Sequence, residues 1–414
     1  MNSTAPEAET SSCRFAANKV MENNNQKKSF SNVIILSIVS FFNDLSSEMI
    51  MPILPMFLQS LGASGQIIGL LGGLRDSLAN ILKVICGYWS DKTGKRKIFV
   101  YLGYGTSTVF KLLLGFAKMW PSALAFASLE RVGKGLRTAP RDALIAESAQ
   151  GKRGKGFGIH RSFDSVGAVL GSVIAFVLLW FAGLELKTII IIAAVFGLAA
   201  LIPIRFVKEN QTPKNNAKLK ISFSILSKPL KLYILVAGIF ALGNFSYMFF
   251  VMKAQHIFTE KASIAAPVLL YVLFNIFYSV FAIPLGSLSD KIGRQPVIIS
   301  GFFLFALVCL GFAYADSTWM FVILFSLYGV VLAAVDGTEK ALISDLAADN
   351  IKATALGTFH AVTGLAALPA GIIAGFLWQN ISPQSTFIFA SITSAVAIAC
   401  FLLFRKTFSS PKSL

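Results

Sequence analysis

The chain has 414 residues, of which 55% are hydrophobic and only 14% are charged, whereas soluble domains carry roughly 25% charged residues. The mean hydropathy is +0.69, and apolar runs near the ~20 residues that span a bilayer follow one another along the chain. These properties exclude a soluble enzyme with one membrane anchor, a disulfide-stapled secreted protein and a disordered regulator. The net charge of +17 is high for such a protein, so the position of the charges is the informative question.

The pattern along the chain predicts twelve transmembrane helices in two sets of six. Residues 1–30 are polar and lack the features of a signal peptide, so we expect a disordered cytoplasmic tail. The apolar runs of the first set lie at 32–59, 64–86, 98–117, 121–146, 156–183 and 187–206. Those of the second set lie at 230–252, 262–285, 297–315, 318–346, 354–379 and 384–404. Period-2 alternation is absent, which argues against a barrel.

The predicted organisation is therefore an all-α membrane protein with two six-helix bundles. The expected segments are a tail over 1–30, an N-terminal bundle over 31–206, a cytoplasmic connector over 207–228, a C-terminal bundle over 229–405 and a cytoplasmic tail over 406–414.

Lys and Arg residues lie mainly in alternate loops, and this bias predicts the orientation. They cluster at 92–97, 152–155 and 205–231, whereas the loops on the other side hold only Lys118, Lys187, Lys253 and Lys261. By the positive-inside rule, both termini are cytoplasmic, and we expect a multi-pass protein of a bacterial inner membrane. Because the basic residues are scattered through short loops, we expect no nucleic-acid partner.

A loop motif occurs twice, after the second and the eighth predicted spans. The first copy is Gly87-Tyr-Trp-Ser-Asp91-Lys-Thr-Gly94-Lys95-Arg96, and the second carries Gly286, Asp290 and Arg294 in matching places. Two such halves in parallel repeat are a common transporter architecture, with the substrate site between them. An ordinary turn with positive-inside residues explains a single copy but not both.

This motif, with the twelve spans and the connector, resembles the signature loop of the major facilitator superfamily, and the resemblance covers residues 31 to 405. It implies a secondary transporter that alternates between inward- and outward-open states. It also implies that the loop residues latch the halves together at the cytoplasmic side. The residues that take this role by their match to the motif are Gly87, Asp91, Gly94, Lys95 and Arg96, with Asp290 and Arg294 in the second copy.

The fourth predicted helix is the richest in ionisable residues at bilayer depth, where such residues are functional candidates by default. Lys134, Arg137 and Arg141 recur at i, i+3 and i+7, which places them on one helical face. A cationic face suits an anionic substrate such as a carboxylate or phosphate. We therefore expect these three residues, with Arg131 and with Asp76 of the second helix, to bind substrate. The alternative is that acids of the same bundle neutralise the cations.

The first predicted helix carries two acids, Asp44 and Glu48, at i and i+4. Neighbouring carboxylates disfavour simultaneous ionisation, so this pair is our candidate for proton coupling. The alternative is that each acid pairs permanently with an Arg of the second or fourth helix. The acid followed by Pro52 and Pro55 resembles the first helix of drug:proton antiporters, whereas the fifth helix lacks the proline of their motif.

Residues that correspond between the halves predict a gate. Arg141-Asp142 aligns with Glu339-Lys340 at an offset of 198 residues, with the charge signs exchanged. We expect Arg141 to meet Glu339 and Asp142 to meet Lys340 when the cytoplasmic side closes. The alternative is packing within one half. In the fifth helix, Arg161 and Asp164 are expected to form a structural pair.

The function predicted from these features is proton-coupled transport of a small organic anion, a carboxylate metabolite or a siderophore. The first alternative is a drug:proton antiporter that exports amphiphilic compounds. The second is a non-transporting sensor or partner-binding membrane protein, which the short loops disfavour. We expect no enzymatic activity, no cofactor and no metal site. The expected partners are the lipid bilayer, a small molecule and protons, and we expect a monomer.

Overall fold

The computed structural model describes residues 30–149, 153–209, 225–348 and 351–408. Most of the predicted tails and connector lie outside the described residues. Within them, all regular elements are helices, which confirms the predicted fold class. The first helix spans Phe30–Ile50. The others are α2 (Leu54–Ser60), α3 (Gly65–Thr93), α4 (Arg96–Gly115), α5 (Trp120–Ser148), α6 (Arg153–Trp180), α7 (Leu186–Ala199), α8 (Leu201–Ile204), α9 (Lys228–Gly243), α10 (Met248–Gln255), α11 (Ala262–Ile292), α12 (Arg294–Tyr314), α13 (Thr318–Leu346), α14 (Lys352–Asn380), α15 (Pro383–Phe404) and η2 (Arg405–Phe408).

Ten segments of the described chain are long and apolar enough to cross a membrane. The remaining two passes are α3 and α5, which have 29 residues each and hold many of the ionisable residues. At 1.5 Å per residue, a helix of that length exceeds the ~30 Å hydrocarbon core. The two charged helices therefore complete the predicted twelve passes.

Two predicted spans are interrupted where the halves meet, and the sixth has a one-residue break at Ala200 between α7 and α8. The first breaks at Met51–Ile53 before α2 begins, because Pro52 and Pro55 remove backbone donors at that point. The seventh is divided into α9 and α10 by residues 244–247. Breaks at bilayer depth are tolerated where protein surrounds the backbone, and both of these border the contact between the halves.

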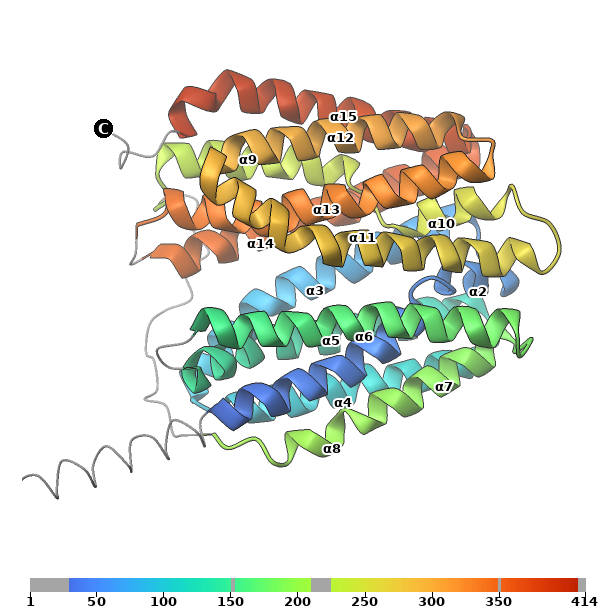
Figure 1. Cartoon of the computed structure of the whole chain (residues 1–414), viewed down its shortest axis with the longest axis horizontal. Helices are drawn as coiled ribbons and strands as arrows, with labels where there is room; N and C mark the ends of the chain where they lie inside the picture. The colour runs from blue at the N-terminus through green and yellow to red at the C-terminus, as the bar shows by residue number, and fades with distance from the viewer. Residues whose placement is uncertain (1–29, 150–152, 210–224, 349–350, 409–414) are drawn as a thin grey trace, which may run out of the picture.

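The helices up to α8 lie together, and so do those from α9 onward (Figure 1). The most extensive contacts between the halves join α3 with α14 and α6 with α11, and α10 also contacts α2 and α3. The α3–α14 contact is close: a Cβ on Gly69 would lie 2.3 Å from the Gly371 carbonyl oxygen, and one on Gly371 would lie 2.2 Å from that of Gly69. Only glycine permits this approach. We call this contact the glycine seam, with Gly73 and Gly375 as further members.

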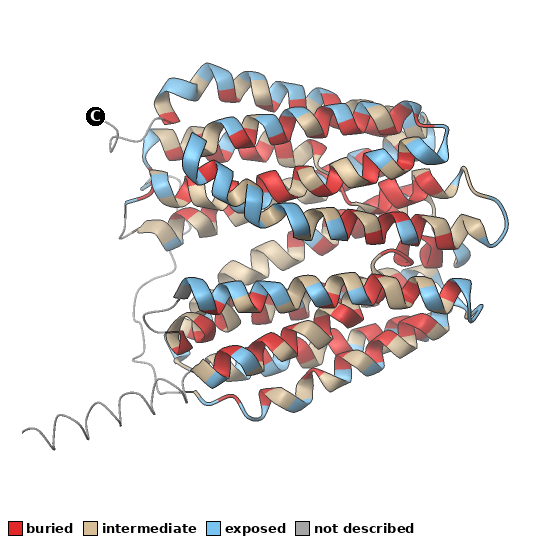
Figure 2. Ribbon diagram, viewed as in Figure 1, coloured by how far each residue is buried: buried red, intermediate tan, exposed pale blue. Residues whose placement is uncertain are grey.

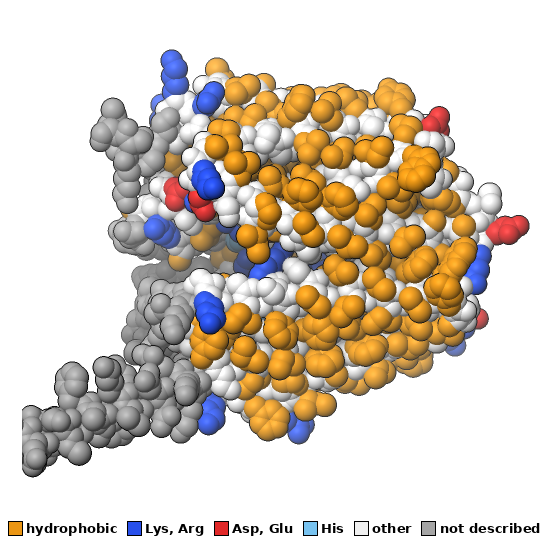
Figure 3. Space-filling view, in the orientation of Figure 1, with side chains coloured by type: hydrophobic (Ala, Val, Ile, Leu, Met, Phe, Trp, Pro, Cys, Tyr) orange, Lys and Arg blue, Asp and Glu red, His pale blue; other side chains and the backbone are white. Residues whose placement is uncertain are grey.

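Both signature loops lie at the end of the molecule where the described chain ends, which we call the basic end after Lys92, Lys95, Arg96, Lys291 and Arg294. Buried residues fill the interior of each bundle and the contact between them (Figure 2). The lateral surface is covered by apolar side chains (Figure 3). In the same view a hollow between the halves opens toward the basic end, with Lys or Arg side chains inside it.

Candidate functional site

The first signature loop ties α3 to the end of α5. Gly94 ends α3 with a positive φ of 68°, which glycine adopts without strain. The turn brings Arg96 back to Asp91, with 2.8 Å between Nη2 and Oδ1. Arg96 also donates to Glu147 at the end of α5. One guanidinium therefore holds two carboxylates together at the basic end.

The second signature loop repeats this arrangement. Arg294 pairs with Asp290 and with Asp345 at the end of α13, where Nε lies 3.2 Å from Oδ2. The sequence analysis did not include Glu147 or Asp345 among the loop residues. The signal was present, because Glu147 and Asp345 correspond at the same offset of 198 residues as the predicted gate.

In this conformation each signature loop makes its described ion pairs within its own half. Lys95 is exposed and makes no ion pair with any described residue. The latch between the halves that the family resemblance implies therefore stays a prediction for the conformation closed at the basic end.

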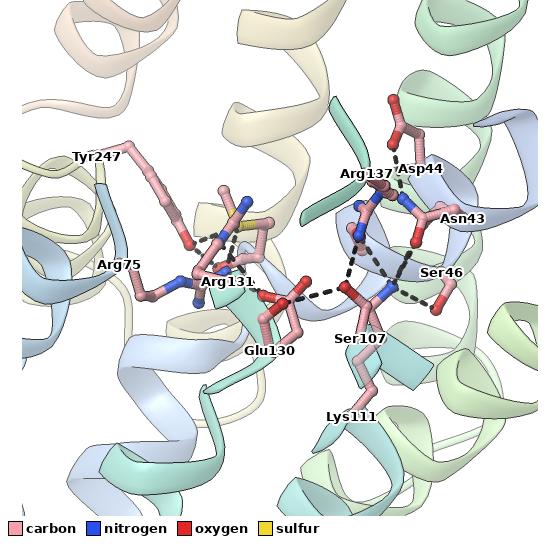
Figure 4. A network of polar contacts seen from close by, with 12 residues as sticks. Asn43, Asp44, Ser46, Arg75, Ser107, Lys111, Glu130, Arg131, Arg137 and Tyr247 are labelled. Carbon is pink, nitrogen blue, oxygen red and sulfur yellow. Dashed lines mark hydrogen bonds and ion pairs between the residues drawn. The ribbon is translucent and has the colours of Figure 1, made fainter. Parts of the chain in front are cut away.

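A buried ionic cluster lies at the centre of the first half, between α3 and α5 (Figure 4). The Glu130 carboxylate lies 3.4 Å from Arg75 Nη2 and 3.2 Å from Arg131 Nε. All three residues are 4–6% exposed. The sequence analysis included Arg131 but assigned no role to Arg75. One carboxylate thus faces two guanidinium groups, which are also close to Met51 and Tyr247.

Lys111 of α4 is buried among neutral oxygen atoms. Its Nζ lies 2.8 Å from Ser47 Oγ and 3.0 Å from Ser46 Oγ, with Asn43 oxygens at 3.4 and 3.5 Å. Only 1% of the residue is exposed. The ammonium therefore fastens α4 to the first helix, and sequence reasoning did not identify this contact.

The predicted cationic face of the fourth helix divides into residues with different surroundings. Arg137 is buried, with its guanidinium 4.5 Å from the Tyr104 ring and 2.6 Å from Ser107 Oγ. Arg141 pairs with the neighbouring Asp142 at 2.9 Å and reaches Ser40 at 3.0 Å. Lys134 alone among the three is exposed, and its ammonium makes no hydrogen bond or ion pair within the described chain. Asp76 is exposed as well.

The two acids of the first helix have hydrogen bonds but no ion pair with a described residue. Asp44 accepts a hydrogen bond from Asn43 at 3.0 Å. Glu48 accepts from Tyr271 at 2.9 Å and from Asn275 at 3.4 Å, both of which belong to α11 in the other half. In this conformation, therefore, neither acid is in direct contact with an arginine of the described chain, although Arg137 and Arg141 act electrostatically on Asp44, and Arg131 does so on Glu48.

The predicted gate pairs are not formed in this conformation, which is hollow at the basic end. Arg141 pairs with Asp142, and Lys340 pairs with Asp336 at 2.6 Å. Glu339 is buried at 9% exposure. Pairing of these residues across the halves stays a prediction for the opposite state.

The predicted pair between Arg161 and Asp164 is wrong for this conformation. Arg161 donates to the hydroxyl of Tyr278 and lies over its ring, because α6 packs against α11. Asp164 lies 3.4 Å from His160 instead. Among the described residues, no group of three or more His, Cys, Asp and Glu side chains is placed to hold a metal ion.

Comparison with known proteins identifies the family. The profile described as Major Facilitator Superfamily matches residues 36–270 and 235–413. An uncharacterized MFS-type transporter of Methanocaldococcus jannaschii is 51% identical over 392 residues, which cover 93% of this chain and 98% of that protein. A multi-drug resistance efflux pump PmrA homolog of Lactococcus lactis is 25% identical over 336 residues, which cover 76% of this chain and 80% of that protein.

Solved structures agree in fold. The nucleoside transporter NupG superimposes with a TM-score of 0.74 at 14% identity and covers 91% of this chain and 99% of its own. The POT family transporter PepTSo has a TM-score of 0.77 at 11% identity and covers 91% of this chain and 98% of its own. With the profile and the archaeal relative both matching nearly the whole chain, this protein belongs to the Major Facilitator Superfamily of secondary transporters and not to a family of enzymes.

Proposed function

We propose that the chain carries a small organic anion together with protons by alternating access. The observation that supports this most directly is the state of Lys134. Its side chain is exposed on a helix at bilayer depth, where a charge costs roughly 2.5–3.5 kcal/mol on insertion scales. Because no described acid pairs with its ammonium, Lys134 is available to bind a substrate carboxylate.

Proton coupling follows from the groups around Lys134. Its ammonium interacts electrostatically with Asp44, and Glu48 interacts with Lys134 in the same way. Ionised acids compete with a substrate anion for the positive field of Lys134. When the acids bind protons, that competition ends and the anion binds more tightly. By linkage the anion favours proton binding to the same extent, which is the condition for symport.

The positive loops support the orientation that belongs to this proposal. Lys92, Lys95 and Arg96 lie at the same end as Lys291 and Arg294, so the positive-inside rule places the basic end in the cytoplasm. Both termini are then cytoplasmic, the membrane is the cell's inner membrane, and the hollow of this conformation faces inward.

Export of cationic amphiphiles with protons is the second candidate. Asp76 supports it, because its carboxylate is exposed and makes no hydrogen bond or ion pair within the described chain. The relative of Lactococcus lactis is named as a multi-drug efflux pump. A cationic drug would take Asp76 as its counter-ion, whereas an organic anion would take Lys134.

Counterflow in proteoliposomes separates the two candidates. Vesicles loaded with succinate, citrate, lactate or a carboxylate siderophore are tested for exchange with the labelled solute outside, and tetraphenylphosphonium is tested in the same way. The proposal expects exchange of at least one anion, which falls tenfold or more in Lys134→Ala and not in Lys118→Ala, an exposed loop control. Exchange of the lipophilic cation, lost in Asp76→Asn, would instead establish the second candidate.

A further inference from the structure

Two guanidinium groups donate to the sulfur atom of Met51, and a tyrosine hydroxyl lies beside it. Arg131 Nη2 lies 2.8 Å from Sδ, and Arg75 Nη2 lies 3.2 Å from it. The Tyr247 hydroxyl also lies 3.2 Å from Sδ. Arg75 and Arg131 come from α3 and α5 of the first half, whereas Tyr247 precedes α10 of the second half, as Figure 4 shows.

A thioether is a poor partner for such donors. Its sulfur is a weak acceptor without charge, whereas a guanidinium presents a rigid fork that matches a carboxylate or phosphate. The remaining acceptor, the Glu130 carboxylate, is shared by both guanidiniums. The nearby Asp76 forms no hydrogen bond or ion pair with either of them among the described contacts.

The close ion pairs of this cluster are therefore uneven, although Asp76 also acts electrostatically on both guanidiniums and Glu48 on that of Arg131. Two buried guanidiniums face one buried carboxylate, and Lys111 nearby is held by neutral oxygens. An unpaired buried charge is costly unless a counter-ion joins it. The position of the Met51 sulfur is where a counter-ion would receive hydrogen bonds from two guanidiniums at once.

We propose that Arg75, Arg131 and Tyr247 form an anion subsite, and that the Met51 side chain fills it until a carboxylate of the substrate displaces it. The substrate class rests on the proposed function, whereas the subsite rests on the contacts above. The bound carboxylate accepts from Arg75 and Arg131 of one half and from Tyr247 of the other, whose hydroxyl hydrogen turns to it from the Met51 carbonyl oxygen, so it joins the two halves.

Met51 also connects the subsite to the backbone. It stands at the break of the first helix, directly before Pro52, and its carbonyl oxygen accepts a hydrogen bond from Tyr247 at 2.9 Å. Displacement of the side chain therefore occurs at the point where α2 separates from the first helix. Occupancy of the subsite thereby acts on the helix that carries Asp44 and Glu48.

The test introduces the anion as a side chain of the protein itself. Met51→Glu places a carboxylate at the subsite, and Met51→Gln is the neutral control of the same shape. The proposal expects Met51→Glu to unfold about 3–5 °C above Met51→Gln at low salt, which is the effect of roughly one additional buried ion pair. It also expects citrate or succinate to raise the unfolding temperature of the wild type and not that of Met51→Glu. Equal or lower stability of Met51→Glu overturns the subsite.

A second measurement covers the case in which Met51→Glu does not fold. Met51→Cys, in a background with Cys13, Cys86, Cys309 and Cys400 replaced by Ser, is modified after folding with a sulfonatoethyl or a trimethylammonioethyl thiosulfonate. The anionic adduct is expected to unfold several degrees above the cationic one, and equal temperatures overturn the subsite. If the anionic adduct is more stable but no organic anion exchanges in counterflow, the subsite stands and the proposed substrate class is wrong.

Discussion

Glu48 of the first helix accepts a hydrogen bond from Tyr271 of α11, with 2.9 Å between Oε2 and Oη. Asn275 of the same helix donates to the same oxygen at 3.4 Å, and also to Ser172 of α6 at 3.1 Å. The candidate proton-binding carboxylate thus lies on the contact between the halves. Because a protonated carboxyl group accepts less strongly than a carboxylate, proton binding at Glu48 acts directly on this contact.

Glu48→Gln is expected to separate exchange from proton-driven accumulation. The amide oxygen still accepts from Tyr271, so the halves stay in contact, but the side chain no longer binds a proton. We expect counterflow to remain within about threefold of wild type, while accumulation driven by a pH gradient falls tenfold or more. Glu185→Gln, in an exposed loop, is the control. Unchanged accumulation in Glu48→Gln would remove this residue from the coupling site.

Tyr271→Phe is expected to weaken the contact between the halves while leaving the Glu48 carboxyl group in place. A hydrogen bond to a charged group contributes about 1.5–3 kcal/mol, so the variant loses part of what holds the halves together in this conformation. We expect the opposite conformation to gain population, measured as broader or shifted distance distributions between spin labels in the two halves. Labels that report a distribution identical to wild type would show that the contact has no such role.

Gly69→Val is expected to disfavour the conformation described here. The added side chain meets the carbonyl of Gly371, and overpacking of this kind costs about 1–3 kcal/mol. Spin labels at Lys187→Cys and Lys261→Cys, at the starts of α7 and α11 at the end opposite the basic end, should move apart in the variant. Gly105→Val is the matched control, because a Cβ at Gly105 has no neighbour within 4 Å. A shift in the control as large as in Gly69→Val would refute the role of the seam.

Cysteines at Arg141 and Glu339 are expected to cross-link only in the state closed at the basic end. In the present conformation Arg141 pairs with Asp142, so the cross-link should be absent when this state dominates and should form when the opposite state is trapped. Cysteines at Arg161 and Tyr278 are a control with the opposite expectation. They should cross-link in the present conformation, because these two residues are in contact in it. If the pair at 141 and 339 forms in no condition, the predicted gate is wrong.

Much of the fold could be predicted because it depends on patterns that one sequence contains. Apolar runs indicate the spans, and the duplicated loop around Asp91 and Asp290 indicates the two halves, whereas the orientation that the loop cations predict stays a prediction. The breaks at Met51–Ile53 and at residues 244–247 were not predicted as breaks. Their apolar runs continue across them, and the stabilising contacts come from the other half.

The site was predictable in residue types and not in pairings. Helical spacing placed Lys134, Arg137 and Arg141 on one face, but a side chain such as Arg137 turns to whatever partner its neighbouring helix offers, here Tyr104. Arg75 had no assigned role, because its partners Glu130 and Met51 are distant in sequence. Tyr247 and Met51 gave no signal at all, since an isolated tyrosine and methionine in apolar helices have no distinguishing pattern.

In the proposed function an organic anion and protons cross the membrane together, with Lys134 as an anion-binding group. The most direct measurement is the internal pH of proteoliposomes, read with a trapped dye, when the anion identified by counterflow is added outside without a pH gradient. Symport predicts acidification of the lumen that is lost in Lys134→Ala and in Asp44→Asn and kept in Lys118→Ala. Anion entry at the wild-type rate with no change of internal pH would contradict it.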